Sequence, residues 1–421
     1  MKKIIVQKFG GSSLASAERI KAVAEICKKT KHNENCNLVV VVSAMGDTTD
    51  DLIDLMEQIN SKPAAREQDM LLSTGEQVSI SLLAMALNKI NEKAQSLTGW
   101  QAGIKTESVH TKARIKEIET ARISKLLDED NIVVVAGFQG FDDNNEIFTL
   151  GRGGSDTTAV ALAVSLGADR CDIYTDVDAV HTSDPRIVKK TSSLKNISYD
   201  EMLELASLGA QVLHPRSVET AKFFHMPLRV RSSWQPDNLG TLVSDNININ
   251  TIERKEIKVI EGQKAVRGVA IDKKQARLSI IGVPDEPGIA AKIFGELSEN
   301  GISVDVIVQC VSNDGHAELD FTVKRDSAEL AKIEIDRIAK LVGAKRTSLD
   351  LNVVKVSIVG AGMIDQPGIA AKMFKSLGQK GINIQMISTS EIRISCIVDE
   401  KQGEEAVQVI HEAFGLSGLS E

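Results

Sequence analysis

The chain has 421 residues, of which 42% are hydrophobic and 26% are charged, and its formal net charge at pH 7 is -8. This length favours two or three domains, and the composition is that of a folded globular protein rather than a disordered one. The negative net charge argues against general binding to nucleic acid or to an anionic membrane, because both require a basic surface.

The start of the chain and its cysteines point to the cytoplasm. Only three consecutive apolar residues, Ile4 to Val6, follow the two N-terminal lysines, which is too few for a signal peptide. No run approaches the roughly 20 apolar residues of a membrane span, so we expect no membrane partner. The five cysteines are dispersed and lack metal-ligand spacing, and we expect them to be reduced.

Apolar runs that end in polar loops predict a parallel sheet. Ile4 to Val6 leads into a glycine turn and a helical pattern over residues 16–29, and the runs Leu38 to Val42 and Ile132 to Ala136 also end in loops. Runs of this kind are typical of strands buried on both faces. Because ligands of parallel sheets bind at the carboxyl ends of the strands, we expect the loops after these runs and after Tyr174 to converge on one site.

Lys8 stands at the end of the first predicted strand, close to Gly10 and Gly11. Its ammonium group and the bare backbone amides could meet the oxygens of a nucleotide phosphate. The alternative is a lysine that is simply solvated. The sequence has no GxxxxGK[ST] motif, which disfavours a P-loop ATPase.

The segment Leu150 to Thr158 combines a cation, glycines, hydroxyl groups and a carboxylate before an Ala-rich apolar stretch. We expect a glycine turn that opens a helix, whose N-terminal amides and dipole face an anion. The planar guanidinium of Arg152 matches a carboxylate with two parallel hydrogen bonds. Glu76 could take an ammonium group, and the alternative is that it stabilises the first turn of its own helix. A substrate with an amine and carboxylates would satisfy both residues.

A polar cluster, Tyr174 to Arg186, follows another short predicted strand. It could hold a nucleotide, and the alternative is a solvated loop. Beyond it, residues 232–258 are rich in turn formers and asparagine and indicate a linker or a domain boundary.

The C-terminal part contains an internal repeat, since Asp285 to Lys292 returns as Asp365 to Lys372. Strand-like segments precede and follow each copy. Two units of the βαββαβ type fit this spacing.

Taken together, these motifs resemble the aspartate kinases of the amino-acid kinase superfamily, and the likeness covers nearly the whole chain. The motifs that match are Lys8 to Ser13, Val42 to Gly46, Gly75-Glu76, Gly151 to Asp156 and Thr182 to Arg186. The resemblance implies an α/β fold: a three-layer α/β/α kinase domain with a mainly parallel sheet at residues 1–245, a linker at 246–262, and ferredoxin-like ACT domains at 263–345 and 346–421.

The resemblance further implies transfer of the γ-phosphoryl group of ATP, with Mg²⁺, to the β-carboxylate of L-aspartate. The product would be 4-phospho-L-aspartate, on the way to lysine, threonine and methionine. The implied catalytic residues are Lys8 and Asp156. The implied aspartate contacts are Ser43, Thr49, Glu76, Arg152, Gly153 and Ser155. The implied ATP contacts are Lys8, Phe9, Gly10, Gly11, Thr175, Asp176, Val180, His181, Thr182, Ser183, Asp184, Pro185, Arg186 and Gln211. The sequence identifies no side-chain ligand of Mg²⁺.

Two residues depart from the family pattern. His181 stands where tyrosine is common, and Gln211 stands where lysine is common, so a charged phosphate contact is lost there. An alternative hypothesis is therefore an amino-acid-sensing protein whose kinase domain has decayed. A kinase of the same superfamily that acts on glutamate or a nucleotide is a further alternative, which the motif set disfavours.

The repeat resembles ACT domains, which sense amino acids. The implied effector contacts are Asp285, Pro287, Gly288, Ile289 and Gln309 in the first copy, and Asp365, Pro367, Gly368, Ile369 and Asn383 in the second. Lysine, threonine or both are the implied effectors, and a role in dimerisation alone is the alternative. Because exposed edge strands of such units pair between chains, we expect a homo-oligomer.

Overall fold

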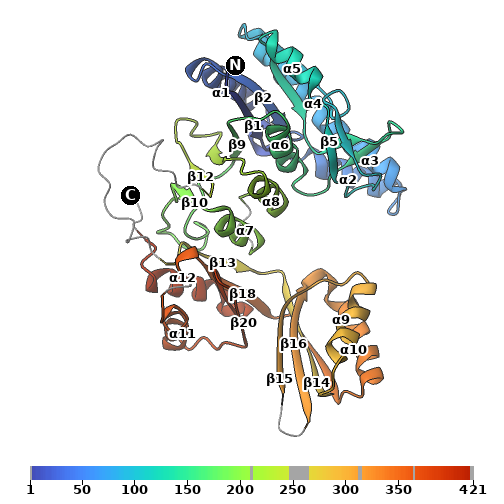
Figure 1. Ribbon diagram of the computed structural model, residues 1–421, viewed down its shortest axis with the longest axis vertical. Coiled ribbons are helices and arrows are strands. Elements are labelled where there is room, and N and C mark those ends of the chain that lie inside the picture. Colours follow the sequence, from blue (N-terminus) through green and yellow to red (C-terminus); the bar gives the residue numbers. More distant parts are fainter. Residues whose placement is uncertain (1, 209–211, 246–264, 312–314, 364–365, 418–421) are drawn as a thin grey trace.

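The computed structural model describes residues 2–208, 212–245, 265–311, 315–363 and 366–417. Within these ranges the chain forms a large N-terminal α/β part and two smaller units, each with its own sheet and helices (Figure 1). We call the two smaller units the first and the second repeat unit.

The N-terminal part is built around an eight-stranded sheet with the order β10-β12-β11-β9-β1-β2-β6-β3. Neighbouring strands run parallel, except that β11 and β12 are antiparallel. In chain order the strands are β1 (Ile4–Phe9), β2 (Asn37–Val42), β3 (Ala94–Leu97), β6 (Ile132–Ala136), β9 (Arg170–Thr175), β10 (Asn196–Ile197), β11 (Leu228–Ser232) and β12 (Thr241–Val243).

Helices cover both faces of this sheet. Successive residues of its central strands point to opposite faces, so they are buried in two different cores. Ile5 packs with α1 and α4 on one face, whereas Val6 belongs to the core shared with α5 to α8 on the other. These helices are α1 (Ala17–Asn33), α4 (Thr74–Lys89), α5 (Ala121–Asp128), α6 (Gly154–Ser165), α7 (Tyr199–Ser207) and α8 (Pro215–Phe223). The predicted three-layer α/β/α fold with a mainly parallel sheet is confirmed.

A second, smaller sheet stands beside the first, with the order β5-β4-β7-β8. Its strands are β4 (Ile104–Thr106), β5 (Ile115–Ile118), β7 (Gln139–Phe141) and β8 (Ile147–Thr149), and α2 (Thr48–Ile59) and α3 (Ala65–Leu72) complete this region. Helix α3 contacts β8.

The stretch Ala65–Lys89, which contains α3 and α4, is long and apolar enough to cross a membrane by length and composition alone. Half of its most apolar window is buried inside the protein. Helix α4 packs against α1, β3 and β6. These contacts are those of a core helix, so the stretch is weak evidence for a membrane span.

Each repeat unit has a four-stranded antiparallel sheet. The first has the order β15-β16-β14-β17, with β14 (Gln275–Pro284), β15 (Val304–Val311), β16 (His316–Lys324), β17 (Arg346–Asp350), α9 (Ile289–Glu299) and α10 (Ala328–Val342). The second has the order β13-β18-β20-β19, with β13 (Gly268–Asp272), β18 (Val353–Val359), β19 (Met386–Thr389), β20 (Arg393–Asp399), α11 (Ile369–Gln379) and α12 (Gly403–Ala413).

The strand pairing departs from the predicted division of the repeats between residues 345 and 346. Strand β17 follows that point but pairs with β14 of the first repeat unit. Strand β13 lies before the first repeat unit but pairs with β18 of the second. No strand follows α12 in the described residues up to 417, so β13 takes the edge position that β17 occupies in the first sheet.

Candidate active site

The predicted catalytic and substrate-binding residues lie together in one cavity of about 840 Å³, which we call the large cavity. It opens beside the carboxyl ends of the central strands β1 and β2, at the N-terminus of α6. Its lining includes all the residues expected to act on or bind the amino acid, namely Lys8, Ser43, Thr49, Glu76, Arg152, Gly153, Ser155 and Asp156.

Lys8 and Asp156 form an ion pair at the floor of the large cavity. Lys8 Nζ lies 2.7 Å from Asp156 Oδ1, and both side chains are largely buried. The contact is an ion pair rather than an aligned hydrogen bond, since Asp156 Oδ1 accepts none from the described residues. At Gly10 a side-chain Cβ would lie 3.5 Å from Lys8 Nζ, so the glycine keeps the backbone open beside the ammonium group.

Glu76 is a buried carboxylate in the lining of the large cavity. The residue is 3% exposed, and its Oε1 accepts a hydrogen bond of 3.1 Å from the backbone N–H of Ala44. Its Oε2 is buried and has no hydrogen-bond partner among the described residues. Burial raises the pKa of Glu76 to about 7. A carboxylate in this position calls for a cationic or hydrogen-bonding group from a ligand.

The glycine turn at the N-terminus of α6 has two residues with positive φ, a conformation that residues with a side chain rarely adopt. Gly151 has φ 73° and Gly153 has φ 70°. A Cβ on Gly153 would also lie 2.2 Å from the ring of His214, so the turn packs directly on that ring. Arg152, between the two glycines, is exposed at the cavity.

Sequence reasoning did not identify the residues that hold this turn from outside. Arg216 donates hydrogen bonds to the carbonyls of Leu150 (3.0 Å) and Ala113 (2.9 Å). His214 caps α8 by accepting the N–H of Arg216, and burial lowers its pKa, so the ring is neutral at pH 7. Both line the large cavity. The only local signal for these two residues is that His214 and Arg216 flank Pro215, the first residue of α8.

Asp69 of α3 is a third residue that sequence reasoning did not identify. It is fully buried and accepts hydrogen bonds from the hydroxyl of Thr149, the N–H of Thr111 and the ring of His110. Since Thr111 and Thr149 line the large cavity, Asp69 fixes one of its walls.

Half of the residues expected to bind the nucleotide line a separate cavity of about 320 Å³, which we call the side pocket. From the predicted set it contains Asp176, Val180, His181, Ser183, Asp184, Pro185 and Arg186. The hydroxyl of Ser183 is buried there without a hydrogen-bond partner among the described residues. Arg186 is exposed and pairs with Asp184 at 2.8 Å.

Some predicted nucleotide contacts point elsewhere. The Phe9 side chain is fully buried and stacks on Tyr174 with ring centroids 4.5 Å apart, so only its backbone is near the glycine turn. The Thr182 hydroxyl is buried and lies 2.9 Å from Nε2 of His411 in the second repeat unit. Thr175 donates its hydroxyl to Asp176. Gln211 lies outside the described residues.

Gly11 and His181 have local structural partners. A Cβ on Gly11 would lie 2.9 Å from the carbonyl oxygens of Ala44 and Gly46, so only glycine allows these two loops to meet. The ring nitrogens of His181 lie 2.8 Å from Asp178 and 3.1 Å from Thr191.

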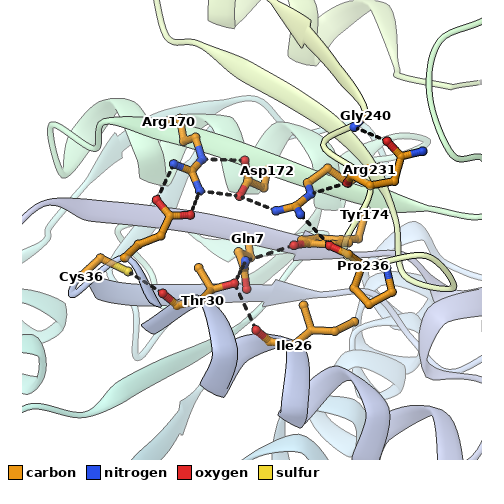
Figure 2. A network of polar contacts seen from close by, with 12 residues as sticks. Gln7, Ile26, Thr30, Cys36, Arg170, Asp172, Tyr174, Arg231, Pro236 and Gly240 are labelled. Atoms are coloured by element: carbon orange, nitrogen blue, oxygen red, sulfur yellow. Dashed lines mark hydrogen bonds and ion pairs between the residues drawn. The ribbon is translucent and has the colours of Figure 1, made fainter. Parts of the chain in front are cut away.

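A buried polar network joins the neighbouring strands β9 and β11 (Figure 2). Asp172 of β9 is fully buried and pairs with Arg170 at 2.9 Å and with Arg231 of β11 at 3.8 Å. Arg231 also donates to the carbonyl of Pro236 at 2.6 Å. Hydrogen bonding to Arg170 lowers the pKa of Glu34 to about 2. The network ties the loop after β11 to the central strands.

Most of the predicted effector contacts in the described residues lie at or near the turns that open α9 and α11, whereas Gln309 lies in strand β15. Gly288 (φ 93°) and Gly368 (φ 95°) cap α9 and α11 in the same left-handed conformation, with open space around them. The other exposed members are Asp285, Pro287, Gln309, Pro367 and Asn383. Ile289 and Ile369 are partly buried against the cores of their units. Asp365 lies outside the described residues.

Three segments of the chain match known protein families. The amino acid kinase family matches residues 3–232, and ACT domains match residues 277–343 and 356–414. The chain is 51% identical over 415 residues to an aspartokinase of Bacillus sp. (strain MGA3), covering 99% of this chain and 98% of that protein.

Among solved structures, the chain is similar to E. coli aspartokinase III. The complex of that enzyme with aspartate and ADP, in its R-state, gives a TM-score of 0.80 at 24% identity, over 98% of this chain and 99% of that chain. At this identity the likeness shows the fold alone. Its T-state complex with lysine and aspartate gives a TM-score of 0.74 at 25% identity, with the same coverage.

Proposed function

The chain belongs to the aspartokinases of the amino acid kinase family, and we propose that it transfers the γ-phosphoryl group of ATP to the β-carboxylate of L-aspartate. The observation that carries this proposal is the large cavity. It holds a buried carboxylate with an unsatisfied oxygen, a guanidinium group and a buried lysine in one space. This set complements the ammonium, carboxylate and phosphoryl groups of the reactants.

The amino acid is held at two charged ends. Glu76 Oε2 accepts the α-ammonium group, because that oxygen is buried and has no hydrogen-bond partner in the described parts of the chain. Arg152 binds the α-carboxylate with its planar guanidinium. Ser43, Thr49 and Ser155 complete the contacts around the substrate, and the N-terminus of α6 adds its dipole.

Phosphoryl transfer then depends on positioning and charge. A β-carboxylate oxygen forms a bond to the γ-phosphorus while the bond from that phosphorus to the β,γ-bridging oxygen breaks, and the electron pair leaves with ADP. Since the attacking carboxylate is already an anion, no general base is required. Lys8 neutralises charge on the transferring group, and Asp156, 2.7 Å from Lys8 Nζ, orients the ammonium group.

The side pocket is the place for the nucleotide, and its buried Ser183 hydroxyl, which has no partner among the residues that the structure describes, is available to the ligand. Mg²⁺ bound together with ATP would supply further neutralisation of the phosphate charge. Among the described residues, no group of three or more His, Cys, Asp and Glu side chains is placed to hold a metal ion.

We further propose feedback inhibition by lysine, threonine or both through the repeat units, in an oligomer. The lysine in the T-state complex of E. coli aspartokinase III supports an amino-acid effector. The open turns at Gly288 and Gly368 offer helix N-terminal amides to a carboxylate. The edge strand β15 exposes Ile307 (47%) and Val311 (56%), which favours pairing with a second chain.

The test is ATP consumption by the purified protein with Mg²⁺ and L-aspartate, with the acyl phosphate trapped by hydroxylamine. We expect turnover with aspartate and none with glutamate. Inhibition by added lysine or threonine assigns the repeat units a sensing role. A folded protein that binds lysine or threonine but does not turn over ATP would instead support the decayed-kinase hypothesis.

A further inference from the structure

The wall of the side pocket is shared between the kinase part and the second repeat unit. On one side stand the loop Asp176 to Arg186 and Leu205 of α7, and on the other stand Val269, Ala270 and Ile271 of β13. Strand β13 is not part of the eight-stranded sheet. It pairs along its whole length with β18, from Gly268↔Val359 to Asp272↔Lys355.

The side chains of β13 alternate between two cores. Val269 belongs to the core of the second repeat unit, and Ile271 packs against that core. Ala270 belongs to the core of the kinase part and is 7% exposed. A larger side chain at Ala270 would therefore extend toward the kinase part and into the space of the side pocket.

The loop that lines the side pocket is also built into the second repeat unit. The N–H of Val269 donates to the carbonyl of Thr182 at 2.8 Å, and the hydroxyl of Thr182 meets His411 of α12. Val188 is a member of the core of the second repeat unit. Gln408 of α12 donates to the carbonyl of Ile187 at 3.0 Å.

We infer that the second repeat unit is a structural part of the nucleotide site, in which β13 closes the pocket through Ala270 and α12 positions the loop from Thr182 to Val188. This inference rests on the proposed function. Its consequence is that changes on the second repeat unit act on nucleotide affinity, whereas the amino-acid contacts around Glu76 and Arg152 lie in the other cavity and are left unchanged. Ala270 determines how much of the pocket a base can fill.

The first experiment measures binding of MgADP by calorimetry, and KM for aspartate, in the full-length Ala270→Leu variant. Three added carbons fill part of a cavity of about 320 Å³, and we expect the dissociation constant to rise about ten-fold or more, with KM for aspartate within about two-fold. Ala371→Leu, at an exposed position of α11, is the matched control. Unchanged ADP affinity in a folded Ala270→Leu protein would overturn the inference.

A second variant keeps the test independent of packing at Ala270. Gln408→Ala removes the hydrogen bond to Ile187 from an exposed position, and Glu405→Ala on the same helix is its control. We expect KM for ATP to rise roughly two- to five-fold for Gln408→Ala alone, since one hydrogen bond is lost. Equal KM values for ATP in both variants would contradict positioning by α12. Wild-type protein that binds no ADP would refute the proposed function instead.

Discussion

At the scale of single residues, Glu76 is a group of the large cavity whose charge changes within the ordinary working range of pH. Its pKa is raised to about 7 by burial, and only the ionised form attracts an ammonium group fully. We expect KM for aspartate to fall as pH rises through about 7, with KM for ATP nearly constant. Glu76→Gln should raise KM for aspartate about 10- to 100-fold and remove this pH dependence. A Glu76→Gln enzyme with the wild-type pH profile would contradict the assignment.

The same pKa makes a prediction about stability without substrate. The folded-state pKa of about 7 exceeds the ordinary value of 4.5, so the folded state binds more protons. Stability from this group is complete below about pH 4.5 and is lost as pH rises through about 7, by up to about 3 kcal/mol. Glu76→Gln should therefore raise the melting temperature at pH 8 relative to wild type, and less so at pH 5. Thermal melts at both pH values, with saturating aspartate as a comparison, measure this.

Lys8 is expected to act on the chemical step rather than on folding. Lys8→Ala removes the cation beside the transferring phosphoryl group, and we expect kcat to fall about 100- to 1,000-fold. Circular dichroism should show the fold intact. Lys21→Ala, at an exposed position of α1, is the control and should keep wild-type kcat. Near-normal kcat in Lys8→Ala would move the catalytic charge to another residue.

At the scale of elements, the turn that opens α6 depends on glycine for two separate reasons. In Gly153→Ala the new Cβ is strained by the positive φ of 70° and also collides with the ring of His214. In Gly167→Ala the only cost is the positive φ of 59°, because the space around that position is open. The strain alone costs about 1–2 kcal/mol, so Gly167→Ala should lower stability by that amount. Gly153→Ala should lower stability more and also raise KM for aspartate. Chemical denaturation and steady-state kinetics compare the two.

Sequence reasoning predicted the elements whose secondary structure follows from the pattern of residues next to each other in the chain. The buried runs ending at Val42 and Ala136 and the glycine turn at Gly151 to Asp156 are coded by neighbouring residues, and the structure places them around one cavity. Strand β13 was not predicted, because its role comes from pairing with β18, which lies about eighty residues further along the chain. Its contact with the side pocket follows from that pairing and could not be read from the motif Thr182 to Arg186.

Side-chain direction was the other limit of the sequence. Phe9 and Thr182 lie in motifs that match the family, yet both side chains face buried cores. A motif indicates which backbone reaches a site, whereas the direction of each side chain depends on the strand register and the packing around it. Similarly, His214 and Arg216 support the glycine turn from a helix about sixty residues away, which no local spacing reveals.

At the scale of the whole molecule, the two repeat units are packed against each other. Lys355 of β18 is buried and forms an ion pair with Asp305 of β15, so the two sheets share a charged contact as well as apolar ones. The second repeat unit in turn contacts the kinase part, through Arg393 with Glu204 and through the N–H of Ala361 with Glu201. The first repeat unit therefore contacts the second, and the second contacts α7, whose Leu205 lines the side pocket.

The pairing of β17 with β14 predicts where the first repeat unit can be separated from the rest of the chain. Residues 275–350 contain the complete sheet β15-β16-β14-β17, whereas residues 275–345 lack β17, which pairs with β14 from Arg277↔Asp350 to Ile281↔Arg346. Without β17, one edge of β14 loses its hydrogen-bond partners, and Leu349 no longer covers the core. We expect the longer fragment to unfold cooperatively and the shorter one to melt at a clearly lower temperature or without a cooperative transition. Circular dichroism of both fragments tests this, and identical melting curves would place the boundary of the first repeat unit before β17.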